Sequence, residues 1–402
     1  MAVEQSSNQV QKKKKKTLGT PDYIMMAVIL LIFAFGVVMV YSASFYYCVN
    51  NGKAPASLAL KQLAIGSVGI IAMLWLTYKF DYHLFSMKAI SWGLYIVSIC
   101  LSILVMFVGK EVNGAKRWIA IGSIQFQPSE IAKVAVIVML ASYIVRNRKK
   151  FNQLKYRIGA WLIFLIPAGI VMLENLSSAI VIGGIGFIMC FISMPKVKIY
   201  IFMVILGFGA VFGAYSLAMS TPEGQDPSNF ILKKVLPAYR LERIQVWLDP
   251  WIDPRDSGYQ PIQALYAVGS GGLFGKGLGN SVQKQSFLPE PYNDIIFAVI
   301  CEELGLVGAL VLILGYAILI IRGLIVAMRS PDYFGSLVAA GISTMVAIQV
   351  IINIAVNTNT IPTTGMQLSL VSYGGTAVAV LLATLGILLN VSKSANIQKV
   401  KK

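Results

Sequence analysis

The sequence predicts an all-α integral membrane protein with about ten transmembrane helices and one large extracytoplasmic loop between helices 7 and 8. Of the 402 residues, 57% are hydrophobic and only 13% are charged, whereas soluble domains contain about 25% charged residues. The apolar residues also gather in stretches of about 20, which is the length that crosses a bilayer as a helix. This composition excludes a soluble secreted protein, a disordered chain and a nucleic-acid-binding domain.

The ten apolar stretches give the expected positions of the helices. We place them at about residues 23–47, 58–77, 89–108, 127–145, 159–174, 177–194, 197–219, 294–321, 334–358 and 366–391. The fifth and sixth are short, and only the polar residues 174–178 separate them. The first stretch is too long for a cleavable signal peptide and lacks a small-residue cleavage site.

The basic residues indicate the orientation in the membrane. Cytoplasmic loops of membrane proteins carry an excess of Lys and Arg, and an even number of helices with both termini inside places most of the basic residues there. The chain then divides into a basic cytoplasmic tail at 1–20, a membrane domain at 21–393 and a cytoplasmic tail at 394–402. The lysine run at 12–16 could bind anionic lipid or nucleic acid, but we interpret it as a tail that helps to fix the orientation.

The loop at 220–293 lies on the outer side and is unusually long and polar. It contains seven of the 17 Asp and Glu residues, and Asp294 follows directly after it. Long loops without structure of their own are uncommon unless they are functional. Residues 230–248 have the pattern of an amphipathic helix on the membrane surface, broken or started near Pro237. An outward-facing loop of this kind suits a substrate with a lipid tail and a polar head.

The residues that several kinds of chemistry require are scarce. The four cysteines lie far apart without a CxxC motif, and His83 is the single histidine. We therefore expect no disulfide framework, no zinc site and no histidine base. No cofactor is evident, and a divalent cation could take part although no acidic cluster has metal-binding spacing.

Asp294 lies where the eighth apolar stretch begins at the outer face. Its carboxylate could cap the helix, because Asp is a preferred N-cap residue. It could instead face a cavity at the membrane edge and act as a general base. The residues alone leave both roles open.

Four charged residues fall inside apolar stretches, where charges are costly and are candidates for function. Glu130 and Lys133 are three residues apart on one helix and could pair as neighbours. Glu302 and Glu303 have no neutralising residue on their own helix, so we expect their partner on another span, with Lys133 as the obvious candidate. We interpret all four as structural pairs, with a catalytic role as the alternative.

Two loop segments offer further binding residues. The glycine-rich run at 269–279 does not match the P-loop, because Ser270 and Gly277 stand where that motif needs other residues. Its backbone amides and Lys276 could still bind an anion such as a lipid pyrophosphate, or the run could be a flexible turn. The segment at 361–365 offers Thr363 and Thr364 as hydrogen-bonding partners for a sugar, with a plain turn as the alternative.

Several pieces of the chain, taken in order, resemble the SEDS family of peptidoglycan glycosyltransferases, the group that contains FtsW, RodA and SpoVE. The resemblance covers about residues 20–393. The matching segments are residues 38–44, 114–119, 127–130 with Lys133, 258–260, 263–269, 271–275, 288–290, Asp294, 302–305, 361–362, 364–365 and 372–375. An FtsW or SpoVE type is favoured over RodA.

The resemblance implies a glycosyltransferase that polymerises lipid II at the outer face of the bacterial cytoplasmic membrane and releases undecaprenyl pyrophosphate. Asp294 aligns with the family's essential aspartate, which is implied to deprotonate the 4-hydroxyl of the acceptor sugar and so to form a β-1,4 link. Lys276, Arg117 and Arg243 then become candidates to stabilise the leaving pyrophosphate, since negative charge develops there.

The resemblance also implies partners and leaves alternatives. The implied partners are lipid II, the nascent glycan, a class B penicillin-binding protein that cross-links it, and other division or elongation proteins. Glu290 is a further substrate-binding candidate. The chain departs from the family at 174–178, where Gln-Pro-Asp-Leu-Gly-Thr is usual, and at Ser369, where proline is usual. A lipid II flippase and a non-catalytic divisome scaffold are the alternative functions.

Overall fold

The computed structural model describes residues 19–112, 115–121, 124–194, 197–221, 236–285 and 287–400. In this part of the chain, ten helices are long and apolar enough to cross a membrane, as predicted. They are α1 (Tyr23–Asn50), α2 (Ser57–Tyr78), α3 (Lys88–Val108), α4 (Pro128–Asn147), α5 (Leu154–Glu174), α6 (Leu176–Ser193), α7 (Val197–Ser220), α11 (Ile296–Arg329), α12 (Tyr333–Asn357) and α13 (Thr376–Val400). The predicted tail at 394–402 is therefore helical as far as Val400, and the lysine run at 12–16 lies outside the described residues.

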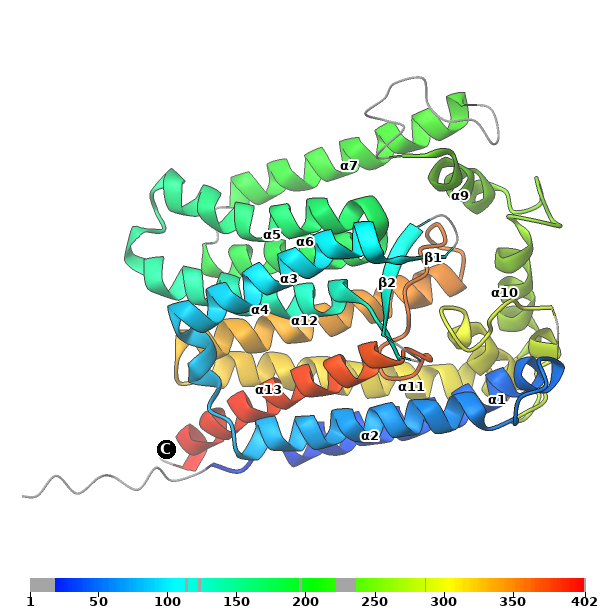
Figure 1. The fold of residues 1–402 in the computed structure, drawn as a ribbon, viewed down its shortest axis with the longest axis horizontal. Helices are drawn as coiled ribbons and strands as arrows, with labels where there is room; N and C mark the ends of the chain where they lie inside the picture. Colours follow the sequence, from blue (N-terminus) through cyan, green and yellow to red (C-terminus); the bar gives the residue numbers. More distant parts are fainter. Residues whose placement is uncertain are drawn as a thin grey trace, which may run out of the picture.

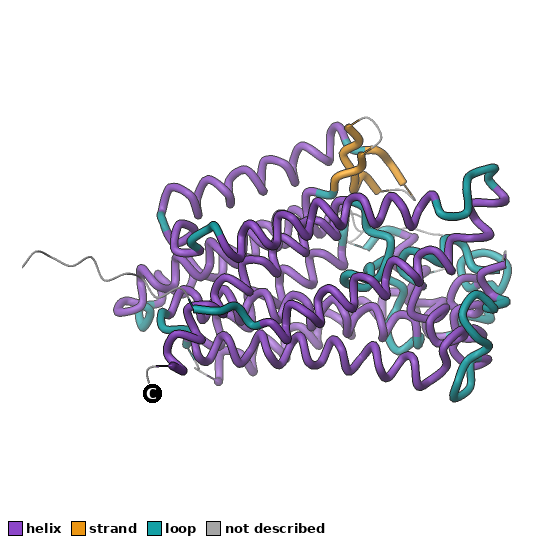
Figure 2. Tube along the Cα trace, turned by 90° about the horizontal axis from the view of Figure 1, so that it is seen from below, coloured by secondary structure: helices purple, strands orange, loops and turns teal. Residues whose placement is uncertain are grey.

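The ten helices lie side by side in one elongated bundle (Figure 1). The two ends of the described chain meet, because the Asp22 N–H donates to Ser392 Oγ at 2.9 Å and Asn396 Nδ2 donates to the Thr20 carbonyl at 2.8 Å. Both therefore lie at the same end of the bundle, as an even number of spans requires. We call the opposite end, which carries the long loop, the loop end. Figure 2 shows that most loops and the strands gather there.

Burial differs greatly between helices. In their most apolar windows, α4 and α12 are 72% buried and α13 is 78% buried, whereas α7 is 6% buried. The buried residues of α12 include many Ala, Gly and Ser residues, and small side chains let helices approach closely in a membrane. The core is therefore formed by α4, α12 and α13, and α7 lies at the edge of the bundle (Figure 1).

A small antiparallel sheet, which the sequence analysis did not predict, leads into α4. Its strands are β1 (Lys110–Val112), β2 (Ala115–Ile121) and β3 (Ile124–Phe126), in the order β1-β2-β3. Ile119 pairs with Phe126 across β2 and β3. Trp118 of β2 pairs with Lys110 of β1, and Gln127 follows β3 and precedes α4.

The long loop contains two α-helices and one 3₁₀ turn in its described part. These are α9 (Ala238–Leu248), α10 (Tyr259–Ser270) and η3 (Gln283–Gln285). The predicted helix at 230–248 is thus confirmed from Ala238 onward, directly after Pro237, and residues 222–235 lie outside the described residues. Leu241 and Val246 of α9 are buried.

The glycine-rich run supports a break in α11 instead of binding an anion. Gly305 has φ 68° and ψ −168°, which interrupts the helical hydrogen bonds. Before the break, the Glu303 carbonyl accepts from Gly277 N of the run at 2.9 Å. After the break, Leu306 N donates to the Gly272 carbonyl of the run at 2.9 Å. A Cβ on Gly275 would lie 2.2 Å from the Glu303 carbonyl oxygen, so the glycine permits this close contact.

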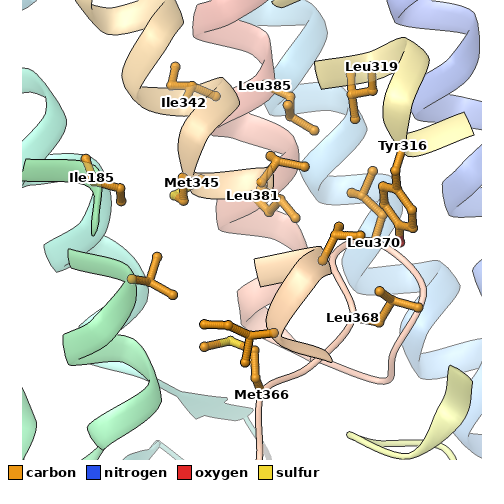
Figure 3. Packing of buried hydrophobic residues seen from close by; sticks show 14 of the residues in the cluster. Ile185, Tyr316, Leu319, Ile342, Met345, Met366, Leu368, Leu370, Leu381 and Leu385 are labelled. Atoms are coloured by element: carbon orange, nitrogen blue, oxygen red, sulfur yellow. The ribbon is translucent and has the colours of Figure 1, made fainter. Parts of the chain in front are cut away.

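The segment between α12 and α13 enters the bundle without forming a helix, so the predicted start of the last span at 366 is wrong. Met366, Leu368, Leu370 and Val371 are buried, and Figure 3 shows Leu370 beside Tyr316 of α11. Non-helical backbone is tolerated at membrane depth only where protein or a cavity satisfies its polar groups. We call residues 358–375 the re-entrant segment.

Side chains from three helices donate hydrogen bonds to backbone carbonyls of the re-entrant segment. The Tyr316 hydroxyl donates to the Ser369 carbonyl. Gln62 Nε2 donates to Ser372 O at 3.0 Å, and Asn353 Nδ2 donates to Met366 O at 2.7 Å.

Candidate active site

A cavity of about 640 Å³ opens at the loop end of the bundle. Its wall combines β2, the first residues of α4 and α6, α9, residues 289–294, the re-entrant segment, α12 and the start of α13. Five of the predicted site residues line it, namely Arg117, Glu130, Arg243, Glu290 and Asp294. The sequence therefore identified residues that are up to 177 positions apart and that the fold brings together.

Asp294 presents its carboxylate to this cavity and does not cap α11. The N-cap residue is Ile295, and no side chain of its own caps the helix, so the capping alternative is wrong. Among the described residues, no other residue forms a hydrogen bond or ion pair with the Asp294 carboxylate, and the Asp294 carbonyl accepts from Asn353 Nδ2 at 2.8 Å and Asn357 Nδ2 at 2.9 Å. The backbone is thus held firmly while the carboxylate stays available.

The surroundings of Asp294 alter its proton affinity. Burial raises the pKa of Asp294 above its ordinary value, and the residue's own backbone N–H and the positive charges of Arg243 and Arg117 oppose part of this increase. The negative charge of Glu290 raises the pKa further. A carboxylate with a raised pKa is a stronger base once it is ionised, which suits a general base.

Within the described residues, Arg117 and Arg243 are each fixed by one backbone carbonyl, which leaves most of their N–H donors for a ligand. Arg117 Nε donates to Glu174 O at 2.8 Å, and Arg243 Nη1 donates to Thr363 O at 3.2 Å. A guanidinium has five N–H donors, so each arginine retains donors for an anion. Burial and the nearby positive charge of Arg243 lower the pKa of Arg117, which indicates a site where positive charge is concentrated.

Gly365 separates Asp294 from Arg117. A Cβ built on Gly365 would lie 3.8 Å from Arg117 Nη1 and 3.9 Å from Asp294 Oδ2. Both functional atoms are therefore within van der Waals reach of the same point, where Gly365 has no side chain. The acid and the cation thus face one small volume of the cavity.

Two further predicted residues have different positions. Glu290 is exposed at the cavity, has φ 47° and accepts from Asn293 Nδ2 at 2.6 Å. Thr364 does not line the cavity, although Thr363 and Gly365 do, and its hydroxyl is buried without a hydrogen-bond partner in the described structure. We therefore leave Thr364 out of the site.

The intramembrane charges pair differently from the prediction. Lys133 Nζ lies 2.7 Å from Glu130 Oε1, so the pairing of these two residues is confirmed. Lys133 is not the partner of Glu302 or Glu303, which was the wrong part of the prediction. The long loop folds down onto α11 and provides both partners instead.

Each glutamate of α11 has its own lysine. Lys276 Nζ lies 2.7 Å from Glu302 Oε1, and Lys284 Nζ lies 2.5 Å from Glu303 Oε1. Ser42 of α1 also donates to Glu303 at 2.7 Å. Lys276 is thus an ion-pair partner that does not line the cavity, and we no longer assign it to a pyrophosphate.

Sequence reasoning missed the polar residues of α12 that complete the site. Gln349 lines the cavity, and Asn353 and Asn357 bind the Asp294 backbone. The three lie four residues apart on one helix face, which is a signal that the sequence contained. The departing motif at 174–178 also reaches the cavity, where Asn175, Ser177 and Ser178 line the wall.

These features define a class of protein: a multi-pass membrane protein with a general-base candidate and two arginines in a cavity at one end of its bundle. This arrangement can remove a proton from a hydroxyl group and bind an anionic leaving group. The sequence model of the FtsW/RodA/SpoVE cell cycle proteins matches residues 22–397. The chain belongs to this family, as the resemblance indicated.

Curated relatives match nearly the whole chain. Stage V sporulation protein E of Bacillus subtilis is 36% identical over 385 residues, which cover 94% of this chain and 98% of that protein. The probable peptidoglycan glycosyltransferase FtsW of Trichlorobacter lovleyi is 35% identical over 387 residues, which cover 94% and 95%. These names agree with the predicted FtsW or SpoVE type.

Solved structures share the fold. RodA of Thermus thermophilus is 26% identical, with a TM-score of 0.63 over 92% of this chain and 96% of that chain. A chain from a peptidoglycan synthase complex, described as coordinating polymerization and crosslinking, is 25% identical, with a TM-score of 0.73 over 93% and 98%. The helix bundle is therefore that of known integral membrane proteins.

Proposed function

We propose that this protein is a peptidoglycan glycosyltransferase that polymerises lipid II into β-1,4-linked glycan strands for cell division or sporulation. The names of the FtsW relatives support this activity. The observation that carries the proposal is the carboxylate of Asp294, which has no partner residue in the described part of the chain and faces the same small volume as Arg117.

In the proposed reaction, Asp294 accepts the proton of the acceptor sugar's 4-hydroxyl. The oxygen attacks the anomeric carbon of the growing chain, and the bond from that carbon to the pyrophosphate oxygen breaks. The configuration is inverted, and undecaprenyl pyrophosphate leaves with the electron pair. Arg117 and Arg243 bind the pyrophosphate more strongly as its negative charge develops, and Glu290 contacts the polar part of the substrate at the cavity. The proposal requires no cofactor.

The proposed topology follows from the same reaction. The loop end faces outward, where lipid II is consumed, and both termini face the cytoplasm, in agreement with the distribution of basic residues. The protein works with a class B penicillin-binding protein that cross-links the product. The similarity to a chain of a peptidoglycan synthase complex supports such a partner.

The activity test uses the purified protein in detergent with labelled lipid II, alone and with a cross-linking partner. We expect glycan polymer from the wild type and none from Asp294→Asn. The matched control is Glu242→Gln, which neutralises another carboxylate of the cavity wall and should retain polymerisation within a few-fold. Normal polymerisation by Asp294→Asn would disprove the assignment of the base.

A folding check on Asp294→Asn and a transport assay with lipid II distinguish the alternative functions. Burial disfavours the ionised form of Asp294, so Asp294→Asn should unfold at the same or a higher temperature than the wild type. A flippase would move labelled lipid II across vesicles without forming polymer, and a scaffold would do neither. The position of Asp294 just before α11, at the loop end, favours the enzyme over a transporter, whose binding residues lie near the midplane.

A further inference from the structure

The cavity has a second group of polar residues that are neutral and that the proposed chemistry does not use. Gln127 and Gln349 both line the cavity. Their exposed fractions are only 8% and 6%, so both side chains are more than nine-tenths buried. Gln127 precedes α4, and Gln349 lies within α12, so two separate elements direct amides into one space.

These two amides have hydrogen-bonding groups without partners. Gln127 occupies the N-cap position of α4, but its side chain caps nothing and forms no hydrogen bond within the described structure. Gln349 uses only Oε1, which accepts from Ser369 Oγ at 3.0 Å, and its Nε2 donors have no partner among the described residues. Because both residues line the cavity, these free donors and acceptors are open to a ligand or water there.

An aromatic side chain completes this part of the wall. Trp118 also lines the cavity, and it lies on β2, the strand that pairs with β3, which ends at Phe126 directly before Gln127. An aromatic ring offers a flat apolar surface with a polar N–H, and an amide offers both donors and an acceptor. Together they match a sugar ring, which has apolar C–H faces and polar hydroxyl and acetamido groups at its edge.

We propose that Gln127, Gln349 and Trp118 form a subsite for an acetamido sugar, an inference that rests on the proposed function and deepens it. None of these three residues carries a charge, whereas the cations of the same cavity, Arg117 and Arg243, are the residues assigned to the pyrophosphate. An uncharged ligand that is rich in hydroxyl and acetamido groups can use the donors and acceptors of both amides.

The position of this subsite fits the proposed base. Asn353, which binds the Asp294 carbonyl, is four residues after Gln349 on α12. Four residues, about 6 Å along the helix axis, therefore separate the level of Gln349 from the level of Asn353. A sugar held by the amides lies about one turn further into the bundle than the anchor of Asp294, and its neighbour in the same substrate reaches the base.

The experiment compares two probes on the purified full-length protein in detergent. Lipid II carries the acetamido sugars, and undecaprenyl pyrophosphate has the same lipid and an anion but no sugar. We expect Gln127→Leu and Gln349→Leu each to weaken lipid II binding about tenfold and to leave undecaprenyl pyrophosphate binding unchanged. Trp118→Leu should act in the same direction.

Matched variants separate binding from folding. Ser343→Ala removes a buried hydroxyl of α12 that donates to the Ala339 carbonyl and does not line the cavity, so lipid II binding should stay within about twofold of the wild type. Arg117→Gln should weaken both probes, because it removes a cation. Melting temperatures identify any variant that does not fold. Gln127→Leu removes no side-chain hydrogen bond that the described residues form, so it remains informative.

The outcomes distinguish this inference from the proposed function. Lipid II affinity that is unchanged in the two Gln→Leu variants, or affinity for both probes that falls equally, would overturn the sugar subsite, whether or not the wild type polymerises. Sugar-dependent binding in a wild-type protein that makes no polymer would support the subsite and overturn the glycosyltransferase. Binding uses no turnover, so the two results are independent.

Discussion

Asn357 of α12 is hydrogen-bonded to the backbone on which Asp294 is mounted. Its Nδ2 donates to Asp294 O at 2.9 Å, and its Oδ1 accepts from Ala298 N at 3.0 Å. The first amides of a helix lack the usual partner four residues earlier, and the Ala298 amide is shared between the Ile295 carbonyl and the Asn357 side chain of a neighbouring helix. This interaction replaces the cap that Asp294 would otherwise supply, so the carboxylate is free to face the cavity.

Removing this anchor should reduce turnover more than substrate binding. We expect Asn357→Ala to lower kcat about 10–100-fold with little change in KM, because a misplaced base costs rate. It should also lower stability by about 1–3 kcal/mol. Polymerisation kinetics and thermal unfolding measure both effects. The control is Thr358→Ala, whose hydroxyl bonds the carbonyls of its own helix; an equal loss of kcat there would remove the special role of Asn357.

The pH dependence of polymerisation should follow the charges around Asp294. The base must be ionised, so kcat/KM should rise with pH through a pKa above the ordinary Asp value of 3.8. Arg243 lowers that pKa and Glu290 raises it. Arg243→Gln should therefore move the acidic limb to higher pH, and Glu290→Gln should move it to lower pH. Shifts in the same direction for both variants would contradict this electrostatic arrangement.

Gly365 tests the geometry between the base and the cation. Its φ of 70° is rarely adopted by residues with a side chain, and an added Cβ would enter the space between Asp294 and Arg117. Gly365→Ala should thus lower kcat/KM at least tenfold and destabilise the protein by about 1 kcal/mol. The comparison variant is Gly52→Ala, which has φ 63° with no atom near its Cβ and should lose stability but retain activity.

The spans were predictable because each membrane helix must present apolar side chains to lipid or protein. The misplaced start of the last span shows the limit of this reasoning. Met366, Leu368 and Leu370 are as apolar as the residues of a membrane helix, yet they lie buried in the re-entrant segment, which is not helical. Hydropathy reports burial and not backbone conformation, and the hydrogen bond from Tyr316 to Ser369 O depends on tertiary contacts that local sequence does not encode.

The site was predictable where a residue's chemistry was unusual for its position. Asp294 and Arg117 are charged residues near the membrane, so their types alone suggested function. Gln127 and Gln349 are neutral and gave no such signal before the fold joined them in one cavity. Lys284 was missed because the prediction sought partners for intramembrane charges on other spans, whereas η3 of the long loop brings this lysine to Glu303.

Removing one member of the Lys284–Glu303 ion pair should destabilise the protein much more than removing both. Both side chains are almost fully buried, with exposed fractions of 1% and 0%. Lys284→Met leaves the carboxylate with Ser42 as its remaining partner, so we expect a loss of about 3–5 kcal/mol, and Lys284→Met combined with Glu303→Leu should recover most of it. Lys276→Met should cost less, because four further hydrogen bonds from the loop reach Glu302. Thermal unfolding of the wild type, the two single variants and the double variant ranks these stabilities. If the double variant were as unstable as Lys284→Met, the ion pair itself would be required for stability, and not only the absence of an unpaired buried charge.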